Sequence, residues 1–243
     1  MTTYSPIVEL RQYTLHAGQL DRLIDLFEHE FIESQEALGI SVIGQFRDRD
    51  DPNRFVWLRG FPSMAARGEA LGAFYGGTVW HAHREAANAT MLDSANVLLL
   101  HPAPGGTGFA LAERSDERIS EDRAAQSVVV TTIHYLDDDA AAGFARFFAT
   151  AMMPTIVAAG GTILATLATE SARNNFPRLP VREDEPVFVW LCSFPDLAAY
   201  ERFGTALRQS DDWRAGASPE ILRQFMRKAE SLTLIPTRRS LLR

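Results

Sequence analysis

The sequence predicts an α+β protein of two tandem βαββαβ repeats, whose two sheets pack face to face as an α/β barrel. The first observation behind this prediction is an internal repeat, because "RFVWLRGFPSMAA" at 54–66 returns as "VFVWLCSFPDLAA" at 187–199. The second is that Trp80 and Trp213 are separated by the same 133 positions as the two copies. The third is that one such sheet leaves a face uncovered by helices, and two sheets can bury both of these faces against each other.

The first repeat contains four strand patterns and two helical regions, the second of them doubled. Alternating residues of β-branched and aromatic type predict strands at 7–15, 41–47, 54–61 and 96–101. Apolar residues three and four apart predict helices at 18–38, 63–75 and 79–92. Gly39 ends the first helix and Ser63 caps the second. This order is the split βαβ, or ferredoxin-like, arrangement.

The second repeat follows the same order. Its strand patterns lie at 127–136, within "AAGGTILATL", at 188–194 and at 231–235, with helical patterns between them. We align Tyr135 with Tyr13 and Gly161 with Gly39, at an offset of 122 positions. The later offset of 133 then predicts an insertion of 11 residues, which we place in the loop at 169–186.

The chain is thereby divided into a first repeat at 1–102, a linker at 103–126 and a second repeat at 127–243. Segments 104–126 and 169–186 lack a periodic apolar pattern, so we expect them to be the most mobile parts of the chain. The insertion at 169–186 is also a candidate lid.

The composition excludes several classes of function. The net charge of −7 argues against binding to nucleic acid or to an anionic membrane surface. Cys192 is the single cysteine, so no internal disulfide can form, and its apolar strand indicates a buried, inert thiol. No signal peptide and no apolar run of membrane-spanning length are evident. We therefore expect a cytoplasmic protein, and a homodimer or higher homo-oligomer, with a small-molecule partner.

Several motifs in order resemble the NIPSNAP family, which belongs to the dimeric α/β-barrel superfamily. They are "VELRQYTLHAGQLDRLIDLF", "SVIGQF", "RFVWLRGF" and "WHAHREAANATMLDSANVLLLHP", which together span residues 7–102, and the resemblance is weaker over 127–236. The resemblance implies the fold and little about the chemistry. The superfamily includes cofactor-free monooxygenases, lactone isomerases, cyclases, haem enzymes and ligand-binding proteins.

The first strand carries the first candidate site. Glu9, Arg11 and Tyr13 alternate along it, so they share one face, which we expect to point into the barrel. The aligned positions in the second repeat, Thr131 and Ile133, are uncharged. One interpretation is an ion pair that stabilises the barrel. The other is that Arg11 binds an acidic or carbonyl substrate while Glu9 acts as a general base.

The segment "WHAHREAAN" is the second candidate site. On a helix, Trp80, Arg84 and Asn88 line one face, with His81 beside them. His83 lies on roughly the opposite side, so the two histidines of one regular helix cannot chelate one metal ion. Each histidine is either solvated or capping, or else has an acid/base role. We expect this polarity to converge with that of the first strand on one wall of the cavity.

Taken together, these residues favour a small-molecule enzyme of the cofactor-independent barrel type, acting on an apolar or aromatic substrate of natural-product type. Cyclisation, isomerisation or oxygenation by acid/base chemistry would fit, with no metal and no cofactor. The alternative is a non-catalytic ligand-binding or scaffold protein with a filled barrel. The candidate catalytic residues are Glu9, Arg11, His81 and Arg84. The candidate substrate-binding residues are Tyr13, Trp57, Trp80, His83, Asn88, Tyr135 and Trp190, and core packing is the alternative role for the tryptophans.

Overall fold

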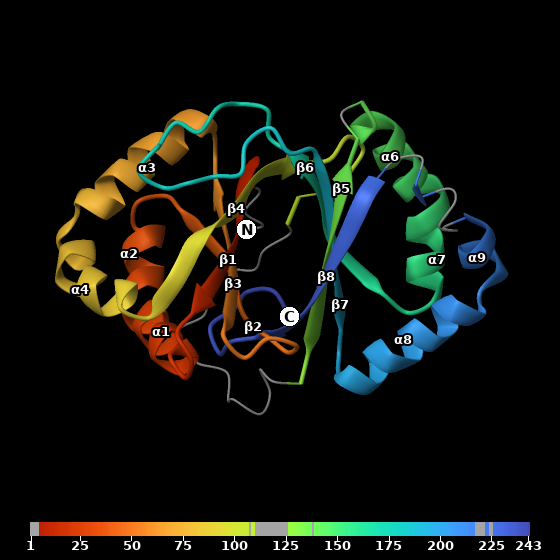
Figure 1. Ribbon diagram of the computed structural model, residues 1–243, viewed down its shortest axis with the longest axis horizontal. Helices are drawn as coiled ribbons and strands as arrows, with labels where there is room; N and C mark the ends of the chain where they lie inside the picture. Colours follow the sequence, from red (N-terminus) through yellow and green to blue (C-terminus); the bar gives the residue numbers. More distant parts are fainter. Residues whose placement is uncertain (1–4, 107, 110–125, 138, 217–221, 224–225) are drawn as a thin grey trace.

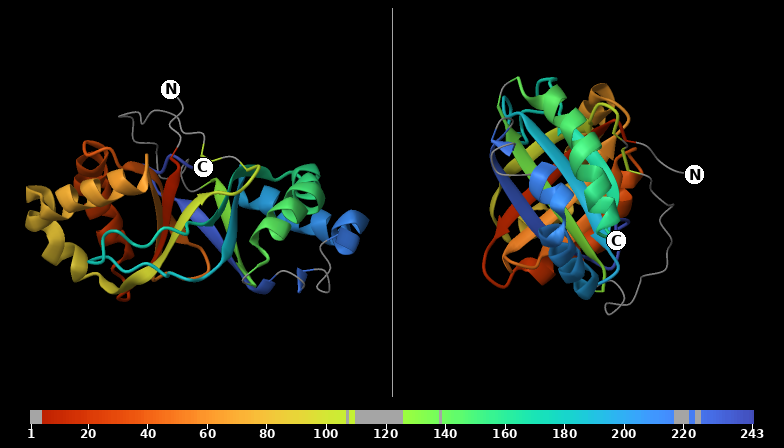
Figure 2. Two further views of the ribbon diagram at one scale, coloured as in Figure 1. Left: turned by 90° about the horizontal axis from the view of Figure 1, so that it is seen from above. Right: turned by 90° about the vertical axis from the view of Figure 1, so that its right-hand side faces the viewer.

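The computed structural model describes residues 5–106, 108–109, 126–137, 139–216, 222–223 and 226–243. Two ferredoxin-like units lie side by side, with their sheets in the middle and their helices on the two outer flanks (Figure 1). The view from above shows the same layering, with the sheets enclosed between the two helical layers (Figure 2). Most of the sequence-predicted linker, at 107 and 110–125, lies outside the described residues.

Eight antiparallel strands close into one barrel in the order β1-β3-β2-β8-β5-β7-β6-β4. Their bounds are β1 Ile7–Leu15, β2 Ser41–Asp48, β3 Arg54–Phe61, β4 Met91–Pro102, β5 Val128–Leu136, β6 Thr162–Thr169, β7 Val187–Phe194 and β8 Met226–Pro236. Short ladders between β2 and β8 and between β4 and β6 join the two repeats. The predicted fold class is therefore confirmed, and closure leaves no open edge on either sheet.

The helices cover the outer face of each sheet. In the first repeat they are α1 Leu20–Leu26, η1 Phe27–Phe31, α2 Ile32–Glu36, α3 Met64–Gly76 and α4 Thr78–Asn88. In the second they are α6 Ala141–Phe147, η2 Phe148–Met152, α7 Met153–Ala158, α8 Leu197–Gln209 and α9 Asp211–Gly216. Side chains of Ser63 and Asp196 cap α3 and α8 by accepting from backbone N–H groups three residues on, as the sequence predicted for Ser63.

The continuous helix of α6, η2 and α7 is long and apolar enough to cross a membrane by length and composition. Its apolar face nevertheless packs inside the protein, in the core of the second repeat. Phe144, Phe148 and Ile156 are buried against the second sheet, as in a core helix of a globular domain.

Strand pairing shows that the alignment of the two repeats made from the sequence is wrong by one residue. Trp57 lies opposite Arg11 in the β1–β3 ladder, and Trp190 lies opposite Thr132 in the β5–β7 ladder. The glycines with left-handed backbone after the first helical region are Gly39 and Gly160, not Gly161. The offset before the insertion is therefore 121, and the insertion has 12 residues.

Apolar side chains from all eight strands fill the barrel. Val8 and Leu10 of β1 meet Val129 and Ile133 of β5 in this interior core. Leu242, beyond β8, is also buried in it. The interior is thus a packed core, as is usual for small barrels.

Candidate functional site

Glu9, Arg11 and Tyr13 point away from the barrel interior and towards the helices of the first repeat. Their neighbours in sequence, Val8 and Leu10, fill the barrel, whereas Tyr13 packs in the cluster between sheet and helices. The expectation that the charged face points inward is therefore wrong. The apolar face of β1 was assigned to the helices, but the closed barrel needs that face for its own core.

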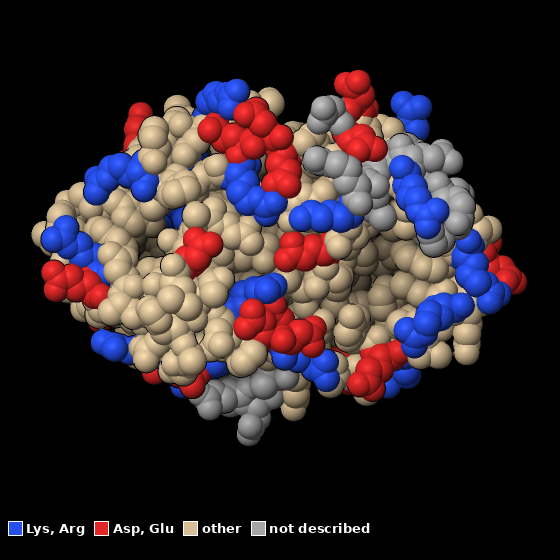
Figure 3. Space-filling model, viewed as in Figure 1, with Lys and Arg blue, Asp and Glu red and all other residues tan. Residues whose placement is uncertain are grey.

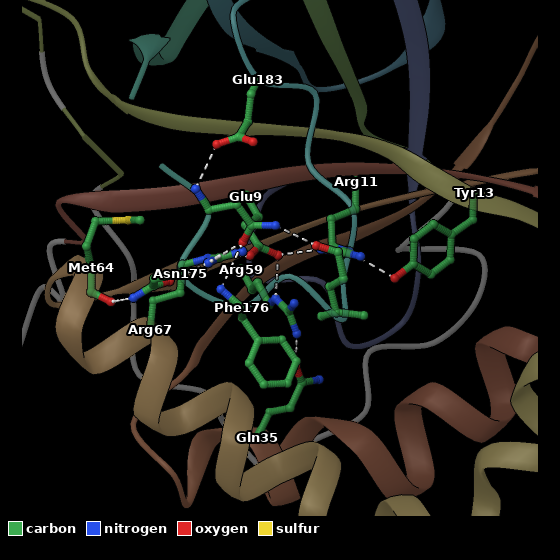
Figure 4. A network of polar contacts seen from close by, with 12 residues as sticks. Glu9, Arg11, Tyr13, Gln35, Arg59, Met64, Arg67, Asn175, Phe176 and Glu183 are labelled. Carbon is green, nitrogen blue, oxygen red and sulfur yellow. Dashed lines mark hydrogen bonds and ion pairs between the residues drawn. The ribbon is translucent and has the colours of Figure 1, made fainter. Parts of the chain in front are cut away.

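Glu9 accepts hydrogen bonds from three arginines that come from three different elements (Figure 4). Arg11 of β1 donates from Nη1 at 2.6 Å, and Arg59 of β3 donates from Nε at 2.8 Å. Arg67 of α3 donates from Nε to the other carboxylate oxygen at 2.7 Å. All four side chains are buried. We call these four residues the Glu9 cluster.

The charges of the cluster perturb one another strongly. Burial alone would raise the pKa of Glu9, but the positive charges of Arg59, Arg11 and Arg67 outweigh it and lower that pKa far below its ordinary value. Burial would lower the pKa of Arg11, but Tyr13 and Glu9 raise it above its ordinary value. A carboxylate held so firmly in its ionised form is a weak base, which argues against Glu9 as the general base.

Tyr13 extends the cluster and adds a hydrogen-bond donor. The Nε–H of Arg11 donates to the Tyr13 hydroxyl at 2.9 Å, so the phenolic proton is directed elsewhere. Among the described residues, no acceptor is hydrogen-bonded to that proton, although Tyr75 lies near enough to affect the pKa of Tyr13. Burial raises the pKa of Tyr13, which keeps the phenol protonated. The indole N–H of Trp57, whose ring lies between Arg11 and Arg59, is also buried without an acceptor in the described chain.

A dense group of aromatic rings surrounds this cluster on its helix side. Trp57 makes edge-to-face contacts with Tyr13 at 6.0 Å and Phe27 at 4.8 Å between ring centroids. Trp80 of α4 contacts Tyr75 at 4.8 Å and is half-buried. The first repeat therefore combines a buried, donor-rich group with closely packed aromatic rings.

The insertion between β6 and β7 of the second repeat crosses over to cover the Glu9 cluster (Figures 1 and 4). Asn174 and Asn175 accept from Nη1 of Arg67 at 3.1 and 2.6 Å. Asn175 also donates to the backbone oxygen of Met64, where α3 begins. Phe176 stacks on Tyr75 at 5.9 Å. We call residues 170–186 the insertion loop.

The insertion loop is also attached along β4. Backbone N–H groups of Glu170 and Arg182 donate to the carbonyls of Leu99 and Val97, at 2.9 and 2.8 Å. A cavity of about 440 Å³ lies there, and Leu99 and Ala141 line it together with loop residues 169–173 and 181–186. Leu99 is the cross-strand neighbour of Glu9, so this cavity adjoins the strand that bears the cluster. The mobility expected of this segment from the sequence remains a prediction.

Most of the polar residues predicted on α4 do not join the cluster. His81, Arg84 and Asn88 are exposed to solvent. His83 is half-buried, and its Nε2 atom lies 3.3 Å from a carboxylate oxygen of Glu30 of η1. The expected convergence of α4 with β1 is therefore wrong, because the side of α4 that packs on the first repeat carries Trp80 and Ala87 instead.

The second repeat uses its corresponding residues differently. Tyr135 lies in the barrel interior, where its hydroxyl donates to Glu230 at 2.9 Å and accepts from Arg182 at 3.1 Å. The residue equivalent to Tyr13 is His134, which accepts from the indole N–H of Trp190 at 3.1 Å. Burial lowers the pKa of His134 to about 4. Trp190 is thus satisfied by a neighbour, unlike Trp57.

Sequence analysis missed Arg59, Arg67, Gln35, Asn174 and Asn175 as members of the site. Comparison of the repeats carried a signal for one of them. In the repeated motif, the buried position of Arg59 is taken by Cys192, whose pKa burial raises to about 12. No local pattern indicated Arg67 or the two asparagines, because only folding brings α3 and the insertion loop to β1.

Charged side chains of both signs are mixed on one face of the molecule. Basic and acidic side chains are interspersed over the face shown in Figure 3. Within the described residues, no three His, Cys, Asp or Glu side chains are grouped as metal ligands would be.

Comparisons with known proteins agree with this fold. Residues 8–104 match the NIPSNAP family model. A candidate monooxygenase from Lactobacillus acidophilus NCFM aligns over 96% of this chain and 94% of its own, with a TM-score of 0.59 and 15% identity. An anthrone oxidase-like protein aligns over 98% and 94%, with a TM-score of 0.58 and 14% identity. A NIPSNAP family protein from Agrobacterium tumefaciens str. C58 is 25% identical over 42% of this chain and 89% of its own, with a TM-score of 0.38. No curated protein matches the sequence significantly.

Proposed function

We propose, from the premise that residues 8–104 form a NIPSNAP domain, that this protein is a small-molecule enzyme acting without a cofactor on an apolar or aromatic ketone. The observation that carries the proposal is the buried Arg11–Tyr13 pair, whose phenolic proton is hydrogen-bonded to no acceptor among the described residues. The reaction would proceed through an enolate, whose oxygen accepts a hydrogen bond from the Tyr13 hydroxyl. Stabilisation of a developing oxyanion by fixed donors is often the largest single contribution to such catalysis.

Each residue of the site has a definite part in this proposal. Glu9 holds Arg11 in place, and Arg11 fixes the Tyr13 oxygen, so that the phenolic proton points to the substrate oxygen. Trp57 presents its free indole N–H as a second donor. The proton on carbon is removed by a base from solvent, such as hydroxide or buffer, and Glu9 takes no part because its pKa is held far below its ordinary value.

The insertion loop is the proposed lid over this site. Tyr13 and Trp57 are 8% and 2% exposed, so a substrate must displace a covering segment to reach them. The loop is the covering segment that arrives from the other repeat, and its hold on the first repeat includes the contacts of Asn174 and Asn175 with Arg67. Lid opening of this kind is common in enzymes that exclude water.

Anthrone is the substrate we propose to test, because one solved structure with this fold is that of an anthrone oxidase-like protein. One anthrone and one O2 give one anthraquinone and one water. The substrate carbon is oxidised and dioxygen is reduced, with one oxygen atom retained in the new carbonyl group. Oxygen uptake and anthraquinone absorbance report the same turnover independently.

The experiment compares the wild type with Tyr13→Phe, with Tyr135→Phe as the matched control in the other repeat. We expect wild-type turnover above the spontaneous oxidation, and a loss of about 10²–10³-fold in kcat for Tyr13→Phe. Tyr135→Phe should retain most of the activity because its ring lies in the barrel core and because Arg182, which donates to its hydroxyl, is also held by Glu185. Equal rates for wild type and Tyr13→Phe would contradict the proposed role of Tyr13.

A non-catalytic scaffold is the second candidate, favoured by the packed barrel interior and by the burial of Glu9 and Arg11. A scaffold predicts that ketones of this class neither turn over nor shift the melting temperature of the wild-type protein.

A further inference from the structure

We infer that the Glu9 cluster contains a binding site for a carboxylate group, located between the free Nη2 atoms of Arg59 and Arg67, and that the ligand is an aromatic acid. The ligand's identity as a substrate rests on the proposed function, whereas the anion site rests on the geometry alone. No residue within the described chain occupies these two donors.

The hydrogen bonds of the two arginines leave the same atom free in each. Arg59 donates from Nε to Glu9 and from Nη1 to Gln35 at 3.2 Å. Arg67 donates from Nε to Glu9 and from Nη1 to Asn174 and Asn175. Both side chains are 0% exposed, and both Nη2 atoms are buried without a partner in the described residues. Buried donors of this kind call for an explanation, because each costs free energy when unsatisfied.

Charge balance points to the same ligand class. Three guanidinium groups face a single carboxylate, so the cluster carries an excess of two positive charges. The other acceptors, Gln35 and the two asparagines, are neutral amides. The faces of Trp57 and Phe61 offer Arg59 only weak compensation, at 5.1 and 5.6 Å. An isolated excess of buried charge is costly, and a bound carboxylate would neutralise one of the two excess charges.

The pKa of Arg67 supports the same inference. Burial lowers its pKa, Glu9 raises it, and the like charges of Arg59 and Arg11 lower it again, with a net decrease. A bound carboxylate would oppose that decrease by adding a second negative charge beside the guanidinium.

Geometry favours a carboxylate. Glu9 already bridges Nε of Arg59 and Nε of Arg67 with its two oxygens, at 2.8 and 2.7 Å. A second carboxylate would offer two acceptor oxygens, one for each of the two unpartnered Nη2 atoms. Aromatic rings lie next to this position, because Tyr75 contacts Arg59 and stacks on Phe176 of the insertion loop. The site therefore suits a benzoate-like group with its ring towards the loop.

The binding experiment uses benzoate, acetate, inorganic phosphate and chloride at constant ionic strength, measured by calorimetry on the full chain. We expect benzoate to bind more tightly than acetate, and both more tightly than phosphate or chloride. Arg67→Gln should weaken benzoate binding at least 10-fold. Arg178→Gln is the matched control, since Arg178 is exposed on the same loop and lies over the Phe176 ring, away from the two free donors.

Two further measurements keep the inference testable if Arg67→Gln does not fold. Asn175→Ala removes one acceptor that orients Arg67 and should weaken benzoate binding several-fold in a folded protein. A crystal grown with 4-bromobenzoate should show an anomalous bromine signal beside Tyr75. Benzoate binding no tighter than chloride, binding unchanged in the Arg67 and Asn175 variants, or phosphate binding more tightly than benzoate would each overturn the inference.

Failure of the inference is distinguishable from failure of the proposed function. Tyr13→Phe should lose turnover yet keep its benzoate affinity, because Tyr13 contacts Arg11 and not the two free donors. If benzoate binds as expected but Tyr13→Phe keeps full activity, the anion site stands and the proposed role of Tyr13 fails.

Discussion

Replacement of Glu9 by glutamine tests whether this single carboxylate holds the first repeat together. The substitution preserves shape but removes the negative charge that three buried arginines share. Breaking a buried ion pair by removing one partner costs about 3–5 kcal/mol, because the remaining charge is uncompensated. Losing all three charge-assisted hydrogen bonds, at about 1.5–3 kcal/mol each, would lower the free energy of unfolding by more than this. Because glutamine keeps one acceptor oxygen, the actual loss should stay below that upper limit. We therefore expect a loss of about 3–5 kcal/mol in the free energy of unfolding, a large part of the usual 5–15 kcal/mol.

Urea unfolding, followed by tryptophan fluorescence and by circular dichroism, measures this loss. Glu33→Gln is the matched control, because Glu33 is 59% exposed and forms an ion pair with Arg239 at the surface. The control should lose less than about 1 kcal/mol, as exposed pairs do. The double variant Glu9→Gln with Arg11→Met should recover part of the loss, because it removes one unpaired charge. A loss below about 1 kcal/mol in Glu9→Gln would refute the view that the carboxylate neutralises the cluster.

Acid titration gives an independent check on the same residue. Because the folded-state pKa of Glu9 lies far below the ordinary value of 4.5, the unfolded state binds the proton more readily. The stabilisation is present above about pH 4.5 and is lost as the pH falls below it. Glu9→Gln should flatten this part of the stability curve, and an unchanged slope would contradict the assignment.

The remaining predictions concern the insertion loop and the second repeat. Gly68→Ala should weaken docking of the insertion loop, because the new Cβ would lie 2.8 Å from Nδ2 of Asn175. Gly72→Ala has open space around its Cβ and should only stabilise α3, by about 1 kcal/mol. Limited proteolysis at 170–186 should distinguish the two variants. The folded-state pKa of His134 is about 4, so the wild type should lose up to about 3 kcal/mol of stability as the pH falls from 6.5 to 4 and the unfolded state takes up the proton. His134→Gln should flatten this fall, and urea unfolding at several pH values measures it. Cys192 should react with a thiol reagent only after denaturation, and rapid labelling of the native protein would contradict its burial.

Sequence alone determined the repeat, the strand and helix order of both units and the closure of two sheets into one barrel. These follow from local periodicity and from the need to bury two bare sheet faces. The motif around Trp57 and Trp190 also fixed the equivalence of β3 and β7, which strand pairing confirms. Glu9, Arg11 and Tyr13 were identified as one group for the same reason, because alternation along a strand places them on one face.

Only the tertiary structure decided which way that face points and which residues meet it. The apolar face of β1 was assigned to the helices, whereas the closed barrel uses it as core. A misalignment of one residue also paired Tyr13 with Tyr135, which lies on the opposite face of its strand. Arg59, Arg67 and Asn175 lie 50, 58 and 166 positions from Glu9 along the chain, and no local pattern relates them. They meet because strand pairing places β3 beside β1, α3 packs over that sheet, and barrel closure brings the insertion loop of the second repeat across the first.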